Sequence, residues 1–277
     1  MKKIFLIIFA TILSSCISTD NDFVIDTSTH GSINMIKVID GEVYVLNSTR
    51  SSIQRIEGDS LVIISDPEIK GRDFVLDFIL DGEDVYLSNT YDEIFKLKGN
   101  SIVDTFKVFS PDKIAKIGNK LYVTSRLNQD GQILYSINTA SKKMTERKIS
   151  SLNNKGILKF AQSSLAVSNE KIYLLDNSTK ILSVLNTDLD LLKEIFLSAK
   201  VDYGNILVVE GKPVILSNEN GKLAIFTIEV SLQYSTKSTD IDISSIDLRT
   251  SAIDKDKVYL YDYIRGKIIV KNRKNIK

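Results

Sequence analysis

Short apolar stretches recur along the chain, and six of them share one pattern. An apolar triplet, centred on tyrosine in five copies and on isoleucine in one, is followed by a turn rich in Asn and Asp. The six triplets are Val43-Tyr44-Val45, Val85-Tyr86-Leu87, Leu121-Tyr122-Val123, Ile172-Tyr173-Leu174, Val214-Ile215-Leu216 and Val258-Tyr259-Leu260. They recur about every 43 residues, the length of one four-stranded propeller blade. The pattern therefore indicates six copies of one structural unit.

Each triplet has neighbours in a fixed order. An apolar strand and a hairpin turn precede it, as at Asp40-Gly41, and Asp-Gly favours the primed turns that match strand twist. An alternating strand follows, as at residues 53–56, and a more polar strand closes most units, as at residues 144–149. A generic β-sandwich or barrel would not require this order six times. The pattern predicts an all-β fold, a six-bladed β-propeller of four-stranded antiparallel blades over residues 22–277.

The last unit is one strand short. It supplies strands near residues 249–253, 257–261 and 267–271, and the tail that follows is short and basic. Residues 22–27 are rich in β-branched side chains and precede the first unit without belonging to it. Pairing them with the last unit leaves fewer exposed strand edges. We expect this N-terminal strand to become the outer strand of the last blade and to close the ring.

The second-strand sequences of the repeat resemble those of known propeller families. Tyr86-Leu-Ser-Asn89, Tyr173-Leu-Leu-Asp176 and Tyr259-Leu-Tyr-Asp262 resemble the signature of YWTD, NHL and TolB-like propellers, with the Trp replaced. Residues 41–47, followed by 53–56, are especially similar to an NHL repeat. The resemblance implies a six-bladed fold that binds proteins, peptides or sugars. No site residues carry over from it.

The N-terminus has the features of an export signal. Lys2 and Lys3 precede an apolar run over residues 4–13, which is about half as long as a helix that spans a bilayer. The sequence Leu13-Ser14-Ser15-Cys16 resembles the lipobox of bacterial lipoprotein signals, in which the cysteine thiol takes the lipid. We therefore expect residues 1–15 to be a signal peptide and residues 16–21 a short tether that is lipidated at Cys16. The alternative is a signal peptide without lipidation and a chance cysteine.

The residue after Cys16 bears on membrane sorting. Ile17 stands where aspartate retains enteric lipoproteins at the inner membrane, so the resemblance implies an outer-membrane location. Exposure to the periplasm or to the outside is left open. The tether reaches at most about 20 Å when extended, so the propeller should lie close to the bilayer.

Charge narrows the choice of partner. The chain has 36 basic and 35 acidic side chains, and removal of the signal takes away two lysines. This balance argues against nucleic acid, which requires a basic face. The lone cysteine excludes an intramolecular disulfide.

No group of residues has the pattern of a catalytic or metal site. The single histidine, His30, has no flanking motif, and there is no Trp of the kind that sialidase and quinoprotein propellers carry. Residues 128–131 and 218–221 faintly resemble calcium loops, but Asn-rich and Gly-rich sequences are also what hairpin turns require. We expect a non-enzymatic binding protein with no cofactor and no metal. The alternative is a glycan-active or lactonase-like hydrolase that uses carboxylates at the channel mouth.

A propeller places the loops that enter its innermost strands around one mouth of the central channel. Those loops hold a mixed-charge collar with one aromatic residue, comprising Arg72, Asp73, Asp112, Lys113, Asp202, Tyr203 and Arg249. We expect this collar to contact a polar or peptide partner; the alternative is that these residues are solvated loop charges. The tyrosines of the repeat are expected to pack in the core or between blades rather than to bind a ligand.

Overall fold

The fold is seen in a computed structural model of the 277-residue chain. It describes residues 22–28, 31–47, 49–67, 69, 75–125, 132–149, 163–177, 179–197, 201–229 and 234–276. Within these ranges, the side chains of residues 163, 201–203 and 234–236 are not described. All statements below concern these parts of the chain.

The described residues form six antiparallel sheets of four strands each. The strands of the first three blades are β2 (Ile33–Ile39), β3 (Glu42–Asn47), β4 (Ser52–Glu57) and β5 (Ser60–Ser65); β6 (Val75–Asp81), β7 (Asp84–Asn89), β8 (Glu93–Lys98) and β9 (Ser101–Lys107); and β10 (Pro111–Ile117), β11 (Lys120–Ser125), β12 (Gln132–Asn138) and β13 (Met144–Ile149).

The strands of the last three blades are β14 (Ser163–Ser168), β15 (Lys171–Asp176), β16 (Ile181–Leu185) and β17 (Leu191–Phe196); β18 (Val201–Val209), β19 (Lys212–Glu219), β20 (Lys222–Ile228) and β21 (Tyr234–Asp242); and β22 (Ile246–Ile253), β23 (Lys257–Asp262), β24 (Lys267–Asn272) and β1 (Phe23–Asp26). A short 3-10 helix at Arg273–Asn275 follows β24.

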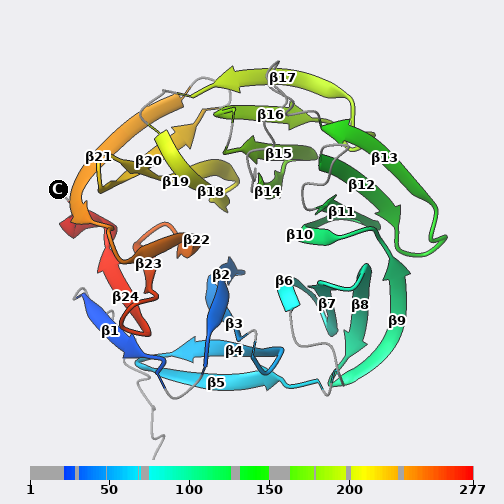
Figure 1. Ribbon diagram of the computed structural model, residues 1–277, viewed down its shortest axis with the longest axis horizontal. Helices are drawn as coiled ribbons and strands as arrows, with labels where there is room; N and C mark the ends of the chain where they lie inside the picture. Colours follow the sequence, from blue (N-terminus) through cyan, green and yellow to red (C-terminus); the bar gives the residue numbers. More distant parts are fainter. Residues whose placement is uncertain are drawn as a thin grey trace, which may run out of the picture.

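The six sheets stand around a central axis as the blades of a propeller (Figure 1). The first strand of each blade, from β2 to β22, lies next to the axis, and the fourth lies at the rim. This arrangement confirms the predicted fold class. In the last blade the rim strand is β1, which pairs antiparallel with β24 from Phe23↔Val270 to Asp26↔Lys267, so the two ends of the chain share one sheet.

The hydrophobic core consists of six layers, one between each pair of neighbouring blades. For example, Tyr86 of the second blade packs with Ile114, Leu121 and Val123 of the third. Because strand side chains alternate between faces, each blade contributes one face to each of two layers. A fully buried Leu or Val in such a layer contributes roughly 1.5–3 kcal/mol.

The repeat tyrosines lie in these layers. Tyr86, Tyr122, Tyr173 and Tyr259 are at most 5% exposed, and each faces the following blade. The interpretation of the tyrosines as packing residues holds for these four, because their side chains are buried between blades.

The fifth copy of the repeat is shifted by one residue from its predicted alignment. Ile215 packs against the fourth blade, whereas Val214 and Leu216 face the sixth. A shift of one residue reverses the faces of a strand. Val214 therefore takes the place of the tyrosine, and the alignment that placed Ile215 there is wrong.

The turns that the sequence indicates have the expected backbone. Asp40 and Gly41 both have positive φ, as a primed hairpin turn requires, and Asn220 and Gly221 have the same geometry. Residues 218–221 therefore form the β19–β20 turn, in which Asn218 accepts a hydrogen bond from the backbone N–H of Gly221. The other predicted turn of this kind, residues 128–131, lies outside the described residues.

The described residues include no helix with the length and apolar character that a membrane-spanning segment requires.

Candidate binding site at the channel mouth

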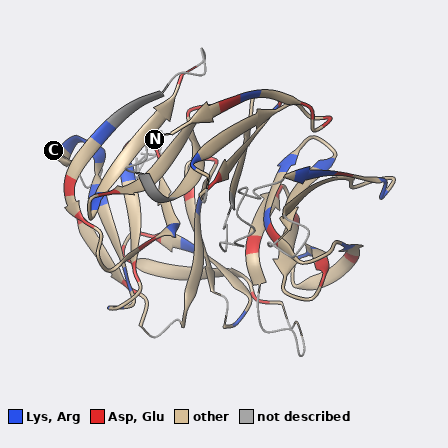
Figure 2. Ribbon diagram, turned by 45° about the horizontal axis from the view of Figure 1, so that its top comes forward, with Lys and Arg blue, Asp and Glu red and all other residues tan. Residues whose placement is uncertain are grey.

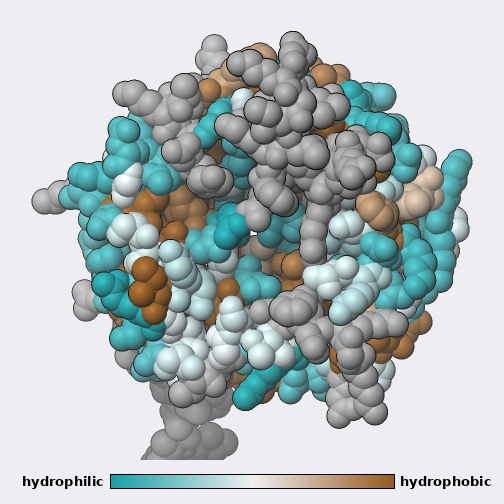
Figure 3. All heavy atoms as spheres, in the orientation of Figure 1, coloured by the Kyte–Doolittle hydropathy of each residue, from teal (hydrophilic) through white to brown (hydrophobic). Residues whose placement is uncertain are grey.

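A cavity of about 920 Å³ opens at the end of the channel where the innermost strands begin. All six blades line it, in order through Asn34, Leu76, Lys113, Ser164, Asn205 and Arg249. Most of these side chains are polar, and hydrophilic residues lie near the centre of the disc, next to neutral and hydrophobic ones, in a space-filling view (Figure 3). The described part of the chain thus places one large polar cavity on the propeller axis.

The structure places three residues of the predicted collar at the cavity. Asp112, Lys113 and Arg249 line the cavity. Asp202 and Tyr203 lie in β18, just before the cavity-lining residues Gly204 and Asn205. The side chains of Asp202 and Tyr203 are not described. Arg72 and Asp73 lie outside the described residues, as do His30, Cys16 and the lipobox residues Leu13, Ser14 and Ser15.

Arg249 is held by a neighbouring carboxylate. Its Nε lies 2.9 Å from Asp247 Oδ1 and its Nη2 lies 3.1 Å from Asp247 Oδ2, a two-pronged ion pair. Burial raises the pKa of Asp247, but the Arg249 guanidinium and hydrogen bonds from Arg249 N and Thr250 outweigh it and hold that pKa below its usual value. Asp247 is therefore ionised at neutral pH and is a poor proton donor.

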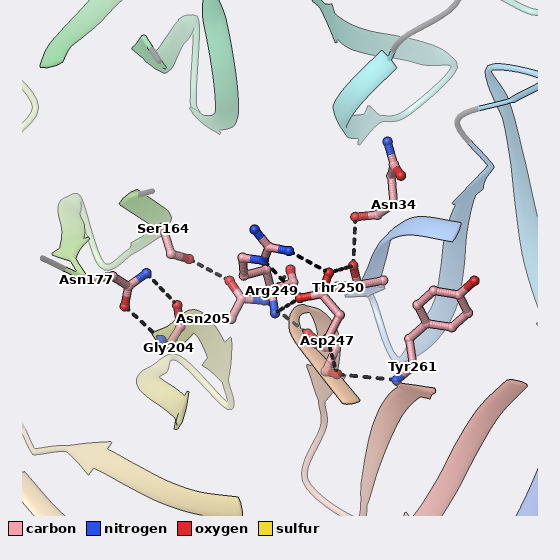
Figure 4. A network of polar contacts seen from close by, with 10 residues as sticks. Asn34, Ser164, Asn177, Gly204, Asn205, Asp247, Arg249, Thr250 and Tyr261 are labelled. Carbon is pink, nitrogen blue, oxygen red and sulfur yellow. Dashed lines mark hydrogen bonds and ion pairs between the residues drawn. The ribbon is translucent and has the colours of Figure 1, made fainter. Parts of the chain in front are cut away.

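Asn205 joins three blades on one side of the mouth (Figure 4). Its Oδ1 accepts a hydrogen bond from Ser164 Oγ at 2.5 Å, in the fourth blade. Its Nδ2 donates to Ser251 O at 3.0 Å and to Arg249 O at 3.3 Å, in the sixth blade. The Asn205 side chain is 4% exposed, so its amide group serves the protein itself.

The same side of the mouth has two further polar links. Thr250 Oγ1 shares its one hydrogen between Asn34 O at 3.2 Å, which joins the last blade to the first, and Asp247 Oδ2 at 3.3 Å. Asn177 bonds both backbone groups of Gly204, accepting from its N–H at 2.7 Å and donating to its C=O at 3.0 Å (Figure 4). A Cβ on Gly204 would lie 3.0 Å from side-chain atoms of Ile215 and Leu175, so a larger residue here would press on both side chains.

On the opposite side of the channel, an ion pair joins the first two blades. Lys37 of the first blade lies 2.6 Å from the carboxylate of Asp77 in the second. Asp77, which is 2% exposed, also accepts hydrogen bonds from the backbone N–H of Phe78 at 2.8 Å and of Ile114 at 2.9 Å. Burial lowers the pKa of Lys37, the Asp77 carboxylate opposes this, and the charge of nearby Lys113 lowers it further.

An aromatic side chain stands at the rim of the cavity. Tyr263 follows β23 and is 57% exposed, whereas Tyr261, which also lines the cavity, is nearly buried. An exposed tyrosine offers a flat apolar face and a hydroxyl group to a ligand. Tyr263 is therefore the cavity residue best placed to contact a large partner first.

The arrangement is suited to binding through hydrogen bonds. The charged side chains of the cavity are Asp112, Lys113, Asp247 and Arg249, two of each sign. Charges of both signs are also mixed over the blades as a whole (Figure 2). Amides and hydroxyls supply most of the remaining polar groups. Among the described residues, no three His, Cys, Asp or Glu side chains come together as metal ligands would.

The sequence analysis missed Asn34, Ser164, Asn205 and Asp247. The signal was present as a polar residue inside an otherwise apolar inner strand, such as Asn205 before Ile-Leu-Val-Val. Such a residue must find hydrogen-bond partners when it is buried, and here the partners belong to neighbouring blades.

No known family model matches the sequence, and a comparison with curated proteins gives no match. Solved structures do resemble the fold. A catalytically inactive virginiamycin B lyase from Staphylococcus aureus, solved with quinupristin, is 12% identical with a TM-score of 0.62; the match covers 90% of this chain and 99% of that one.

Two other solved structures are similar to this chain. A member of the DUF4221 family from Bacteroides vulgatus is 7% identical with a TM-score of 0.64, over 93% of this chain and 96% of that one. BamB from Moraxella catarrhalis is 10% identical with a TM-score of 0.53, over 88% of this chain and 84% of that one. At these identities the likeness shows the fold alone.

Proposed function

We propose that this chain is an outer-membrane lipoprotein whose propeller is a non-enzymatic binding scaffold in the bacterial cell envelope. Its channel mouth takes a peptide segment of a protein partner. The observation that carries the binding proposal is the cavity of about 920 Å³, lined by amides, hydroxyls and balanced charges from all six blades. Peptide groups present donors and acceptors in equal number, which such a lining can match.

The binding proposal also draws on the repeat itself. Its likeness to NHL, YWTD and TolB-like propellers favours a protein or peptide partner over nucleic acid. The near balance of basic and acidic side chains points the same way.

The membrane proposal draws on the N-terminal sequence. In it, the signal over residues 1–15 is removed and lipid on Cys16 anchors the protein. Labelled palmitate should enter the wild-type protein and not a Cys16→Ser variant, which should leave the membrane fraction. Palmitate-free wild-type protein, or a Cys16→Ser variant that stays with the membrane, would contradict lipid anchoring.

The binding site is tested by a photo-reactive amino acid placed at two exposed positions. At Tyr263, on the cavity rim, it should form adducts with the partner in intact envelopes. At Phe196, which is 70% exposed on the outer strand β17, it should not. Equal adducts at both positions, or adducts at Phe196 alone, would place the partner elsewhere.

Protease treatment of intact cells, run in parallel, separates a periplasmic scaffold from a surface-exposed binder. Resistance of the protein to the protease, together with an envelope partner, would indicate a periplasmic scaffold. Loss of the protein to the protease, with no envelope partner found, would indicate a surface-exposed binder.

The alternative proposal is a glycan-active or lactonase-like hydrolase that uses carboxylates at the mouth. A solved lyase with this fold keeps that class open, but the described carboxylates give it little support. Asp247 forms an ion pair with Arg249. Because its pKa is lowered, it does not hold the proton that a general acid must donate. Turnover of a glycan or lactone that is lost on Asp112→Asn substitution would favour the enzyme.

A further inference from the structure

The rim strand of the first blade is apolar and exposed. β5 (Ser60–Ser65) contains the run Leu-Val-Ile-Ile, in which Val62, Ile63 and Ile64 are 38%, 50% and 44% exposed. Among the described residues only β4 pairs with β5. Alternate backbone N–H and C=O groups along its outer side therefore have no strand partner there.

The rim strands of the other blades carry charges that β5 lacks. β9 contains Asp104 and Lys107, β17 contains Lys193 and Glu194, and β13, β21 and β1 also include charged residues. Charged side chains on an edge strand oppose pairing with another chain. Among the described rim strands, β5 alone is without this protection.

The residues on either side of β5 are acidic. Asp59 precedes the strand and Asp66 follows it, and both are exposed. Within the described residues neither carboxylate has an ion pair. The nearby Arg55 is bound to Glu57 instead. A second copy of β5 in antiparallel pairing would bring Asp59 against Asp66 of its partner at both ends, which like charges oppose. A strand with basic ends would instead be attracted.

We propose that β5 is a docking edge for an extended segment of a partner protein, in which an apolar strand is flanked by basic residues. The partner strand pairs with the free edge of β5 through backbone hydrogen bonds, and its apolar side chains cover Val62, Ile63 and Ile64. Its basic ends meet Asp59 and Asp66. This is β-strand addition, in which backbone bonds supply affinity and side chains supply specificity. The β5 edge is separate from the channel mouth. A test of strand addition at β5 is therefore independent of a test of peptide binding at the mouth.

The test uses a fluorescent peptide of alternating Val and Thr with two lysines at each end, and the wild-type protein. Anisotropy should show saturable binding. An Ile63→Lys variant should weaken it at least about tenfold, because it places a charge on the edge. The matched control is Val103→Lys on β9, which is 55% exposed on a strand that already carries charge. It should bind the peptide no differently from the wild type.

A charge reversal tests the recognition of the ends without altering β5. The Asp59→Lys, Asp66→Lys double variant should lose affinity for the lysine-flanked peptide and gain it for a glutamate-flanked one. Methylation of alternate peptide nitrogens should abolish binding, because it removes the donors that strand pairing needs.

Other results overturn the proposal. Failure of the lysine-flanked peptide to bind, or equal binding by Ile63→Lys, would show that β5 is not a docking edge. Equal binding of both peptides by the wild type would refute the charge argument. Sedimentation showing a wild-type dimer that Ile63→Lys dissociates would make the occupant a second copy of this chain.

Discussion

Two opposite blades of the propeller, the second and the fifth, are linked to their neighbouring blades by different polar side chains. Asp77 in the second blade and Asn205 in the fifth hold corresponding positions in their inner strands, each before an apolar residue that packs on the preceding blade. Each bonds to both neighbouring blades, and each is almost fully buried. On one side of the channel the link is a carboxylate, and on the other it is an amide.

The groups that surround the two side chains explain the difference. Asp77 meets donors only: the Lys37 ammonium and the backbone N–H groups of Phe78 and Ile114. Asn205 meets a donor on one side, Ser164, and backbone carbonyls on the other. A carboxylate can only accept hydrogen bonds, whereas an amide can accept and donate. One link between blades is therefore charged and the other is neutral, and local hydrogen bonding sets which is which.

The largest effect is expected from Asp77→Ala. The substitution leaves the Lys37 ammonium, whose side chain is 21% exposed, without its counter-ion, and it leaves the N–H of Ile114 without its acceptor at a position where Asp77 is 2% exposed. Removing one partner of a buried pair typically costs about 3–5 kcal/mol. The free energy of unfolding, from urea titration, should fall by that amount.

A matched control for Asp77→Ala is Asp104→Ala. Asp104 also pairs with a lysine, Lys142, but both are partly exposed at the rim. Such pairs contribute about 0–1 kcal/mol. Similar losses in the two variants would show that Asp77 is no more than a surface ion pair.

Much of the fold could be predicted from the sequence because its signals are local. The triplets around Tyr86 and Tyr173, and the turn at Asp40-Gly41, depend on strand alternation and on backbone φ. The fifth blade was misaligned where the local signal was weak. There, Val214 and Ile215 are both β-branched and apolar, and only the neighbouring blades decide which faces where.

The candidate site could be predicted only in outline. Topology alone places Asp112, Lys113 and Arg249 at the mouth, because every inner strand begins there. The partners of Asn205 lie more than 40 residues away in sequence, in two other blades. No spacing rule within one repeat reveals such contacts.

A smaller and pH-dependent effect is expected from Asn205→Asp. The new carboxylate faces the carbonyl oxygens of Arg249 and Ser251, so burial and repulsion should raise its pKa above the unfolded value of about 3.9. For an acid with a raised folded pKa, the folded state binds more protons. Stability relative to the wild type should therefore fall as pH rises through about 4, by about 1.4 kcal/mol for each pKa unit.

The measurement for Asn205→Asp is urea unfolding of variant and wild type from pH 4 to pH 8. The reciprocal variant, Asp77→Asn, introduces no new acid and should not reproduce this profile, although it too is destabilised by the loss of the ion pair. A flat difference between Asn205→Asp and wild type across this range would mean that the surroundings of Asn205 tolerate a charge.

The smallest effect is expected from Thr250→Val, which keeps the branched shape and removes the hydroxyl. The loss of the hydroxyl that Thr250 shares between Asn34 O and Asp247 Oδ2 should cost about 1 kcal/mol. Thr239→Val is the matched control, because Thr239 donates to Leu223 O within the fifth blade. Both variants should lose similar stability, but only Thr250→Val weakens the link between the last blade and the first. Amide exchange should therefore quicken in β2 and β22 for Thr250→Val alone. If exchange quickens equally in both variants, the hydrogen bonds around the mouth stabilise single blades, and the contrast between the Asp77 and Asn205 links has no bearing on how the ring is held closed.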